Sequence, residues 1–282
     1  MTLLHVNSTR LSFHTQGEGP ALLLLHGFTG SSATWTPHLP TFEGFTTVAV
    51  DLLGHGDSDA PPTPGRYRME RCVDDLTSLL DQLEIERAAV LGYSMGGRVA
   101  LQFALRAPDR LWALVLESAS PGIEDAAERE DRVRSDAALA DEIERNGIDA
   151  FVDRWQALPL FASQRRLPVA VRDELRRQRL RNSPVGLANS LRGAGAGQEP
   201  AVLGRLAEIR IPTLLIAGAL DEKYAAFARK MSETLPCART QIVPDAGHAT
   251  HLEQPEAFDR AAGGFLRERI DAGEGKEAPP CQ

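Results

Sequence analysis

The chain has 282 residues, of which 43% are hydrophobic and 25% charged, and its formal net charge at pH 7 is −8. A hydrophobic fraction of this size can bury the core of one domain, and the ordinary content of charged residues argues against a largely disordered chain. Because nucleic acids and anionic membranes attract positively charged surfaces, the acidic balance argues against both as partners and favours a soluble protein.

The beginning of the chain and its cysteines bear on the compartment and on metal binding. The first ten residues, MTLLHVNSTR, show no basic stretch followed by an apolar signal-peptide core, and the apolar run at 21–25 is far too short to span a bilayer. None of Cys72, Cys237 and Cys281 forms a CxxC pair, and no segment has metal-ligand spacing or a phosphate-binding glycine loop. We therefore expect a cytoplasmic protein that needs neither a metal nor another cofactor.

Short apolar runs alternate with amphipathic stretches along most of the chain. The runs are rich in Val, Leu and Ile with little alternation, as in strands of a parallel sheet that is covered on both faces. They are ALLLL (21–25), FTTVAV (45–50), RAAVLGY (87–93), LWALVLES (111–118) and PTLLIAG (212–218). Helical patterns between them cover about 70–84, 95–107, 225–235 and 255–269. This alternation predicts an α/β fold with a doubly wound, mostly parallel sheet.

The alternation stops between residues 120 and 200, where the sequence is helical in pattern and rich in arginine. Strand-like sequence resumes after Pro200 with RIPTLLIAG. A helical insertion between two halves of a sheet is expected to cover its carboxyl edge, where α/β proteins bind ligands. We therefore predict a core formed by 1–119 and 201–269, a helical cap at 120–200 and a disordered tail at 270–282.

A serine stands between two glycines in GYSMG (92–96), after a predicted strand and before a predicted helix. This G-x-S-x-G arrangement is typical of a nucleophile elbow, in which a sharp turn exposes the serine. Such a serine needs a base and a third group that orients the base. Asp221 follows the predicted strand at 212–218, and His248 follows the next strand along the chain. The order is thus serine, acid, histidine. We predict a Ser94–His248–Asp221 triad and interpret His251 as a residue that caps the next helix.

Two loops complete the predicted site. LLHGFTGS (24–31) carries a His-Gly pair directly after the first predicted strand and resembles the oxyanion-hole turn of α/β-hydrolases. We expect the backbone N–H groups of Phe28 and Met95 to stabilise a developing oxyanion there. In DLLGHGDSD, Asp51 and His55 are interpreted as residues that brace turns.

Arg98 indicates the charge of the substrate. It lies four residues after Ser94, so both side chains are expected on one face of the predicted helix. A guanidinium that points into a pocket pairs best with a carboxylate or a phosphate. We therefore expect a small anionic molecule as the substrate.

Several segments together resemble the MenH family of menaquinone biosynthesis. They are GYSMGGR, ESASPGI, RNSPVGLANSLRGAGAGQEP, and AGALDEKY with AGHATHLEQP, and the resemblance covers about residues 20–266. Ala196 departs from the pattern, where a threonine is expected. Family members are 2-succinyl-6-hydroxy-2,4-cyclohexadiene-1-carboxylate synthases with the α/β-hydrolase fold. The resemblance implies a lyase in which Ser94, assisted by His248, removes the proton next to the succinyl ketone so that pyruvate leaves.

The same resemblance implies the residues that bind the substrate. Matched motif by motif, the family's carboxylate-binding arginines fall on Arg98, Arg132 and Arg179. Arg134 and Arg181 lie so close in the sequence that a shifted assignment stays open in the cap.

Two aromatic residues correspond to pocket positions of the family, Tyr93 at the elbow and Trp155 in the cap. Trp155 also forms an apolar i, i+4, i+7 stripe with Phe151 and Leu158, which is equally typical of a helix that packs inside the cap.

Two other functions stay open from the sequence. A serine hydrolase acting on a small anionic ester or a C–C bond, through an acyl group on Ser94, would use the same triad and oxyanion hole. A receptor that has abandoned catalysis would have no chemical need to keep Ser94, Asp221 and His248. The chain is expected to be a monomer or a homodimer.

Overall fold

The computed structural model describes residues 2–199 and 201–273, and this part of the chain forms one eight-stranded sheet in the order β1-β2-β4-β3-β5-β6-β7-β8. The strands are β1 (Thr2–Val6), β2 (Thr9–Gln16), β3 (Ala21–Leu25), β4 (Thr46–Asp51), β5 (Ala88–Tyr93), β6 (Leu111–Glu117), β7 (Thr213–Gly218) and β8 (Ala238–Val243). β1 and β2 pair antiparallel, β2 also pairs antiparallel with β4, and all other neighbours run parallel. The predicted α/β fold is confirmed.

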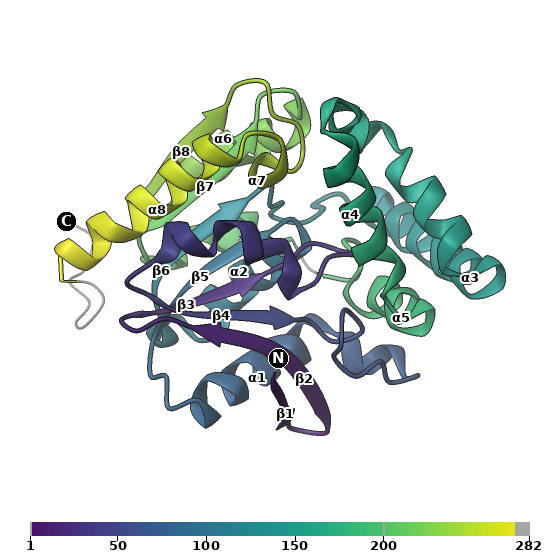
Figure 1. The fold of residues 1–282 in the computed structure, drawn as a ribbon, viewed down its shortest axis with the longest axis horizontal. Helices are drawn as coiled ribbons and strands as arrows, with labels where there is room; N and C mark the ends of the chain where they lie inside the picture. Colours follow the sequence, from purple (N-terminus) through teal and green to yellow (C-terminus); the bar gives the residue numbers. More distant parts are fainter. Residues whose placement is uncertain (1, 200, 274–282) are drawn as a thin grey trace.

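Helices cover both faces of the sheet (Figure 1). The α-helices are α1 (Met69–Gln82), α2 (Met95–Arg106), α3 (Ala126–Gln156), α4 (Val169–Leu180), α5 (Pro184–Ala194), α6 (Glu222–Ser232), α7 (Thr250–Glu253) and α8 (Pro255–Asp271). The 3₁₀ helices are η1 (Ser32–Phe42), η2 (Pro64–Tyr67), η3 (Pro108–Arg110), η4 (Pro159–Arg166) and η5 (Leu203–Glu208). One buried apolar cluster joins α1, α2 and α6 to the sheet, and a second joins η1 and α8 to its opposite face.

The five strands predicted from apolar runs correspond to β3 through β7, with ends that agree within one residue. β8 is the strand expected before His248, though without predicted bounds, and β1 and β2 were not predicted. β1 is mostly exposed, β2 is mostly buried in its first five residues and exposed in its last three, and both include polar side chains, as expected for a hairpin at the edge of a sheet.

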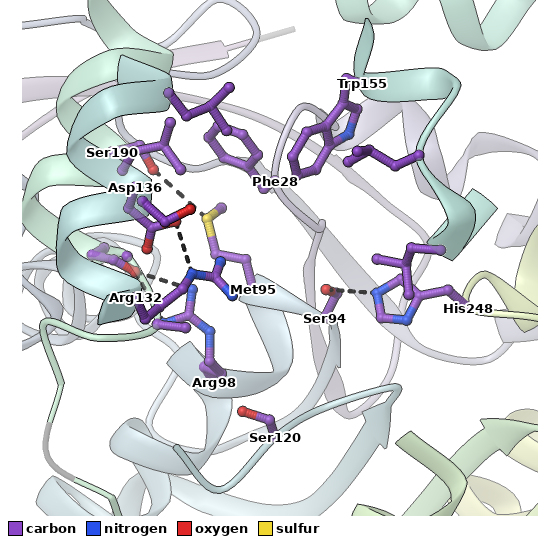
Figure 2. A pocket seen from close by; sticks show the side chains of 18 of the residues that line it. Phe28, Ser94, Met95, Arg98, Ser120, Arg132, Asp136, Trp155, Ser190 and His248 are labelled. Carbon is purple, nitrogen blue, oxygen red and sulfur yellow. Dashed lines mark hydrogen bonds and ion pairs between the residues drawn. The ribbon is translucent and has the colours of Figure 1, made fainter. Parts of the chain in front are cut away.

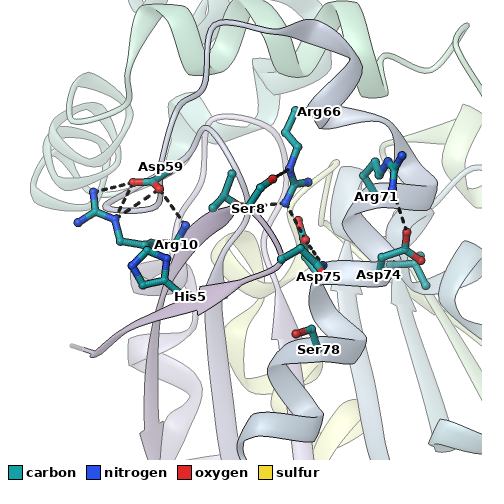
Figure 3. Close-up of polar contacts among 12 residues, drawn as sticks. His5, Ser8, Arg10, Asp59, Arg66, Arg71, Asp74, Asp75 and Ser78 are labelled. Atoms are coloured by element: carbon teal, nitrogen blue, oxygen red, sulfur yellow. Dashed lines mark hydrogen bonds and ion pairs between the residues drawn. The ribbon is translucent and has the colours of Figure 1, made fainter.

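Side-chain contacts fasten this hairpin to α1 and to the loop before it (Figure 3). Asn7 and Arg66 both donate to the buried Asp75 carboxylate at 2.7 Å. Arg10 donates from its side chain and its backbone to Asp59. These contacts join distant parts of the chain and tie the edge of the sheet to the helical layer.

α3, α4 and α5 lie together beyond the carboxyl ends of the central strands (Figure 1). They are held to one another by a separate buried cluster that includes Ala140, Ile143, Leu187 and Leu191. The chain between β6 and β7 is thus helical or irregular wherever it is described. This arrangement places a helical layer over the sheet edge at which β5 ends in the serine turn.

Two further observations concern the ends and the membrane. α8 runs to Asp271, so Ile270 and Asp271, which the sequence placed in the disordered tail, are helical. The remainder of that predicted tail, 274–282, lies outside the described residues. Among the described helices, none is both long and apolar enough to cross a membrane.

Candidate active site

Ser94 occupies the sharp turn between β5 and α2, with φ 52° and ψ −105°. Such a backbone conformation is strained for a residue with a side chain and persists only where the surroundings enforce it. The backbone around the turn is packed too closely for side chains at the two glycines. A Cβ on Gly92 would lie 2.3 Å from the Gly96 carbonyl oxygen, and a Cβ on Gly96 would lie 2.3 Å from the Leu25 carbonyl oxygen. The two glycines let the elbow pack tightly while the serine side chain lines a cavity.

The structure brings the three predicted triad residues together. His248 Nε2 lies 3.0 Å from Ser94 Oγ, and His248 Nδ1 lies 2.7 Å from Asp221 Oδ2. The other Asp221 oxygen accepts the Tyr224 N–H at 3.2 Å at the start of α6, which fixes the carboxylate. Because a carboxylate only accepts hydrogen bonds, Nδ1 carries the imidazole proton and Nε2 is left to accept from the serine hydroxyl.

A buried glutamate supports both the nucleophile and the histidine. The Glu117 carbonyl accepts the Ser94 N–H at 2.8 Å, and its carboxylate accepts from Thr250 Oγ1 at 2.6 Å and from His251 Nδ1 at 2.9 Å. Burial alone would raise the pKa of Glu117, but the neighbouring His251 and these hydrogen bonds outweigh burial, so the pKa of the carboxyl lies below its usual range. His251 therefore binds Glu117, and it makes no cap hydrogen bond to α8.

The two residues predicted to form an oxyanion hole, Phe28 and Met95, line the same cavity as Ser94. Phe28 lies in the tight turn after β3 that the 2.9 Å hydrogen bond from Gly30 N–H to the Gly27 carbonyl closes. Met95 is the first residue of α2, where helix N–H groups have no partner within the helix. Within the described part of the chain, neither N–H donates to a protein acceptor, so both are available to a substrate oxygen.

The loop DLLGHGDSD (51–59) supports the chain that follows β3, which includes Phe28. Asp51 accepts the N–H of Ser32 at 2.6 Å and that of Asp57 at 2.9 Å. His26 Nε2 accepts the Leu52 N–H at 3.0 Å. Burial and a neighbouring histidine lower the pKa of His55 to about 3, so its ring is neutral at physiological pH.

A cavity of about 480 Å³ opens at Ser94 between the sheet and the cap. Figure 2 shows Ser94 facing His248 on one side of it, with Arg98 and Arg132 together on the other. Aromatic rings from the core and the cap form much of the remaining wall, among them Phe28, Trp155, Phe161 and Tyr224. A wall that combines aromatic rings with convergent charged groups is typical of sites for small polar molecules.

Arg98 reaches the cavity as predicted, but its guanidinium already has protein partners. It donates to the carboxylate of Glu199 and, at 3.0 Å from both Nη1 and Nη2, to the Ala194 carbonyl. Burial raises the pKa of Glu199 to about 7 against the lowering effect of Arg98.

Arg132 also lines the cavity and bonds to Asp136 through Nε at 2.8 Å. Its side chain is 44% exposed. Arg134, the shifted alternative, is 66% exposed, pairs with Asp131 and Glu130 on the outer surface of α3, and does not line the cavity. The geometry therefore favours Arg132 over Arg134 as the cavity arginine.

Arg179 lies beside the 480 Å³ cavity and not in it. It lines a neighbouring cavity of about 310 Å³ that shares Phe28, Tyr93 and Phe161 with the first. Arg179 is only 6% exposed, its Nε has no hydrogen-bond partner, and its guanidinium lies 5.3 Å from the centre of the Phe161 ring. Burial lowers its pKa to about 10. Arg181, by contrast, is 72% exposed and binds Asp57.

The two predicted aromatic residues both face the cavity. Tyr93 lies with its ring centre 4.7 Å from that of His251 and 5.5 Å from that of His248, and burial raises the pKa of its phenol well above its usual range. Trp155 packs 5.6 Å from Phe151 in the cap, and its buried Nε1 has no partner. Trp155 thus belongs to the cap core and lines the cavity at the same time.

Sequence reasoning missed the carboxylates that bind the cavity arginines. Asp136 follows Arg132 by four residues, and this i, i+4 spacing on a predicted helix was a usable signal. Glu199 lies 101 residues from Arg98 and had no local signal. Across residues 2–199 and 201–273, no group of three or more His, Cys, Asp or Glu side chains is arranged to hold a metal ion.

Known proteins resemble this chain over most of its length. The family model for the alpha/beta hydrolase fold matches residues 20–255. A Bacillus subtilis (strain 168) protein provisionally named 2-succinyl-6-hydroxy-2,4-cyclohexadiene-1-carboxylate synthase is 46% identical over 253 residues, which are 88% of this chain and 92% of that protein. The synthase of the same name from Serratia proteamaculans (strain 568) is 30% identical over 260 residues, covering 92% and 98%.

Among solved structures, MenH from S. aureus is similar with a TM-score of 0.88 and 36% sequence identity. The similarity covers 92% of this chain and 98% of that chain. Both the core and the cap therefore have counterparts in that structure.

Proposed function

The chain belongs to the family of 2-succinyl-6-hydroxy-2,4-cyclohexadiene-1-carboxylate synthases within the α/β-hydrolase fold, and we propose that it catalyses the reaction for which these relatives are named. In this reaction pyruvate is eliminated from 2-succinyl-5-enolpyruvyl-6-hydroxy-3-cyclohexene-1-carboxylate, as a step of menaquinone biosynthesis. The enzyme is then a carbon–oxygen lyase and consumes no water.

The reaction begins at the carbon next to the succinyl ketone. Ser94 Oγ, whose proton His248 Nε2 can accept at 3.0 Å, removes the proton from this carbon. The electron pair moves through the ring double bond and expels the enol ether oxygen, so that the ring gains a second double bond and enolpyruvate leaves. Enolpyruvate then takes up a proton to become pyruvate, which balances the proton removed from the ring.

The charge that develops in the transition state lies on the ketone oxygen. We assign the N–H groups of Phe28 and Met95, neither of which donates to a protein acceptor among the described residues, to that oxygen, because fixed donors stabilise such an enolate. The same arrangement serves acyl transfer in hydrolases, because an oxyanion forms there too.

The substrate carries three carboxylates, and arginines are suited to bind them. We assign Arg98 and Arg132 to carboxylates inside the main cavity. Arg179 is assigned to a carboxylate that reaches the partition between the two cavities, formed by Phe28, Tyr93 and Phe161. Because no acidic side chain of the described residues pairs with Arg179, a substrate anion would compensate a buried charge there.

One observation carries the proposal: an intact hydrogen-bonded triad opens into a cavity that presents guanidinium groups opposite the serine. The serine-hydrolase alternative uses the same triad, but the family membership favours the lyase. The test is to supply the purified protein with the enolpyruvyl substrate and follow pyruvate with lactate dehydrogenase. Pyruvate release that depends on enzyme concentration supports the proposal, whereas its absence together with hydrolysis of small anionic esters would favour the alternative.

The proposed setting is the cytoplasm, with a small anionic molecule as the only required partner and no metal or other cofactor. The net charge of −8 supports a function away from nucleic acids and anionic membranes. A monomer or a homodimer is expected, and light scattering on the purified chain distinguishes the two.

A further inference from the structure

Arg98 is held by one partner outside the cavity wall, the carboxylate of Glu199, and by one at the wall, the carbonyl of Ala194. Glu199 is buried and does not line the cavity, whereas Arg98 and Ala194 do. A guanidinium has five N–H donors. Three hydrogen bonds, one to Glu199 and two to the Ala194 carbonyl, leave two donors for a molecule in the cavity. The protein therefore fixes which edge of Arg98 a substrate can meet.

Within residues 2–199 and 201–273, Arg98 is the cation that pairs with Glu199. Arg98 approaches it from α2 and lowers the pKa of its carboxyl, whereas Glu70 of α1 raises that pKa. Beyond Arg98, the cap contributes the carboxylate of Asp136. Arg98 and an ionised Glu199 thus form a buried pair whose net charge is close to zero.

We propose that Glu199 is a positioning residue that sets both the orientation of Arg98 and the net charge it presents to the cavity, and so determines how tightly the site binds a substrate carboxylate. This inference rests on the proposed function, because it takes the cavity as the site of an anionic substrate. An arginine that is paired with a carboxylate attracts anions less strongly than an unpaired arginine does. It still offers two N–H donors in fixed directions. The site then selects carboxylates by geometry and releases its anionic product readily.

The matched control is a second buried arginine–carboxylate pair outside the cavity. Arg66 binds Asp75 at 2.7 Å, and Asp75 is as deeply buried as Glu199 (Figure 3). Neither residue lines the 480 Å³ cavity. Asp75→Asn therefore reports the loss of a buried charge whose arginine partner lies outside the cavity.

The experiment compares Glu199→Gln with Asp75→Asn at pH 8, where Glu199 is mostly ionised in the wild-type protein. Glutamine keeps a hydrogen-bond acceptor for Arg98 and removes the negative charge. We expect KM for the enolpyruvyl substrate to fall about tenfold with kcat little changed. Asp75→Asn should lower Tm and leave KM unchanged. An unchanged or raised KM in Glu199→Gln would make Glu199 a structural residue only and overturn the inference.

A binding measurement separates this inference from the proposed function. Calorimetry with 2-succinylbenzoate, the aromatic analogue of the product, needs no turnover, and its Kd should fall in Glu199→Gln as KM does. If the wild-type protein releases no pyruvate but this shift in Kd is found, the proposed function fails and the inference stands. A Kd that does not shift refutes the inference whether or not pyruvate is released.

The wild-type Glu199 provides a test if the glutamine variant does not fold. Lowering the pH from 8 to 6 protonates Glu199 and removes the same charge, while the analogue's carboxylates stay ionised. In a His248→Gln background, which removes the imidazole from the cavity, Kd for 2-succinylbenzoate should fall about tenfold over this range. A Kd that is constant between pH 6 and 8 contradicts the inference.

Discussion

Ser94 Oγ and His248 Nε2 are 3.0 Å apart and handle the same proton. Removing either group breaks one proton-transfer unit, so we expect Ser94→Ala and His248→Ala each to lower kcat by about 10²–10⁴ and the double variant to be little slower. Initial rates of pyruvate release measure this, with Tm checked in each variant. Ser120→Ala, which removes another cavity hydroxyl, should keep most of the activity. A double variant far slower than either single one would mean that the two residues act separately.

Arg98→Ala removes a proposed carboxylate-binding group and also leaves Glu199 buried without its cation. We expect KM to rise about 10- to 100-fold, the effect of losing a charge-assisted bond, together with a lower Tm. Arg98→Lys should recover only part of the affinity, because an ammonium group lacks the planar fork. Adding Glu199→Gln to Arg98→Ala should restore Tm and not KM. Equal rises in KM for the carboxylated substrate and a neutral ester would show that Arg98 has only a structural role.

At the scale of elements, Glu117 joins the end of β6 to the loop that carries His248. Its carbonyl holds the Ser94 N–H and its carboxylate holds Thr250 and His251 at the start of α7. We expect Glu117→Gln to lower kcat about tenfold with KM little changed, because the distance between nucleophile and base is no longer fixed. Kinetic constants and Tm measure both effects.

Asp259→Asn is the matched control for Glu117→Gln. Asp259 binds a buried histidine, His38, at 2.7 Å and joins η1 to α8 without contact to the triad. We expect it to lower Tm with kcat unchanged. If the two variants reduce kcat equally at matched stability, Glu117 does not position the catalytic groups.

The sequence allowed some elements to be predicted and not others, for physical reasons. β3 to β7 are buried on both faces, so their continuous apolar runs stand out. β1 and β2 form an edge hairpin held by charged side chains such as Arg66 and Arg10, and its mixed pattern does not reveal a strand. The hairpin depends on partners far along the chain, which no local pattern contains.

In the site, too, some positions could be predicted from the sequence and others could not. The positions of Ser94, Asp221 and His248 follow from strand ends that meet at one sheet edge, and spacing on α2 placed Arg98 at the cavity. The angle at which α4 packs decides that Arg179 lines the neighbouring cavity, and helix packing is not legible in the sequence.

For the whole molecule, buried histidines make stability depend on pH. Burial lowers the pKa of His55 to about 3, below its unfolded value of about 6.5. Between these values the unfolded chain binds a proton that the folded chain excludes. The contribution of His55 is therefore complete above about pH 6.5 and is lost as the pH falls towards 3.

Chemical denaturation between pH 7 and 5 measures this dependence. One such group makes stability fall by up to about 1.4 kcal/mol per pH unit. The pKa of Glu199 is raised to about 7, so its protonation stabilises the folded protein as the pH falls through the same range. The test is therefore the difference in slope between the wild-type protein and a His55 variant. The slope of unfolding free energy against pH should be smaller in His55→Asn than in the wild-type protein. Equal slopes would show that His55 does not exclude a proton in the folded state.

The central claim is that Ser94 removes a carbon-bound proton and that no water enters the products. The mass of the ring product after complete turnover of the enolpyruvyl substrate tests this most directly. Elimination predicts a product lighter than the substrate by the mass of pyruvic acid, with no ¹⁸O incorporated when the reaction is run in ¹⁸O-water. A ring product heavier than this by one water, or a substrate-derived acyl group on Ser94, would contradict the account.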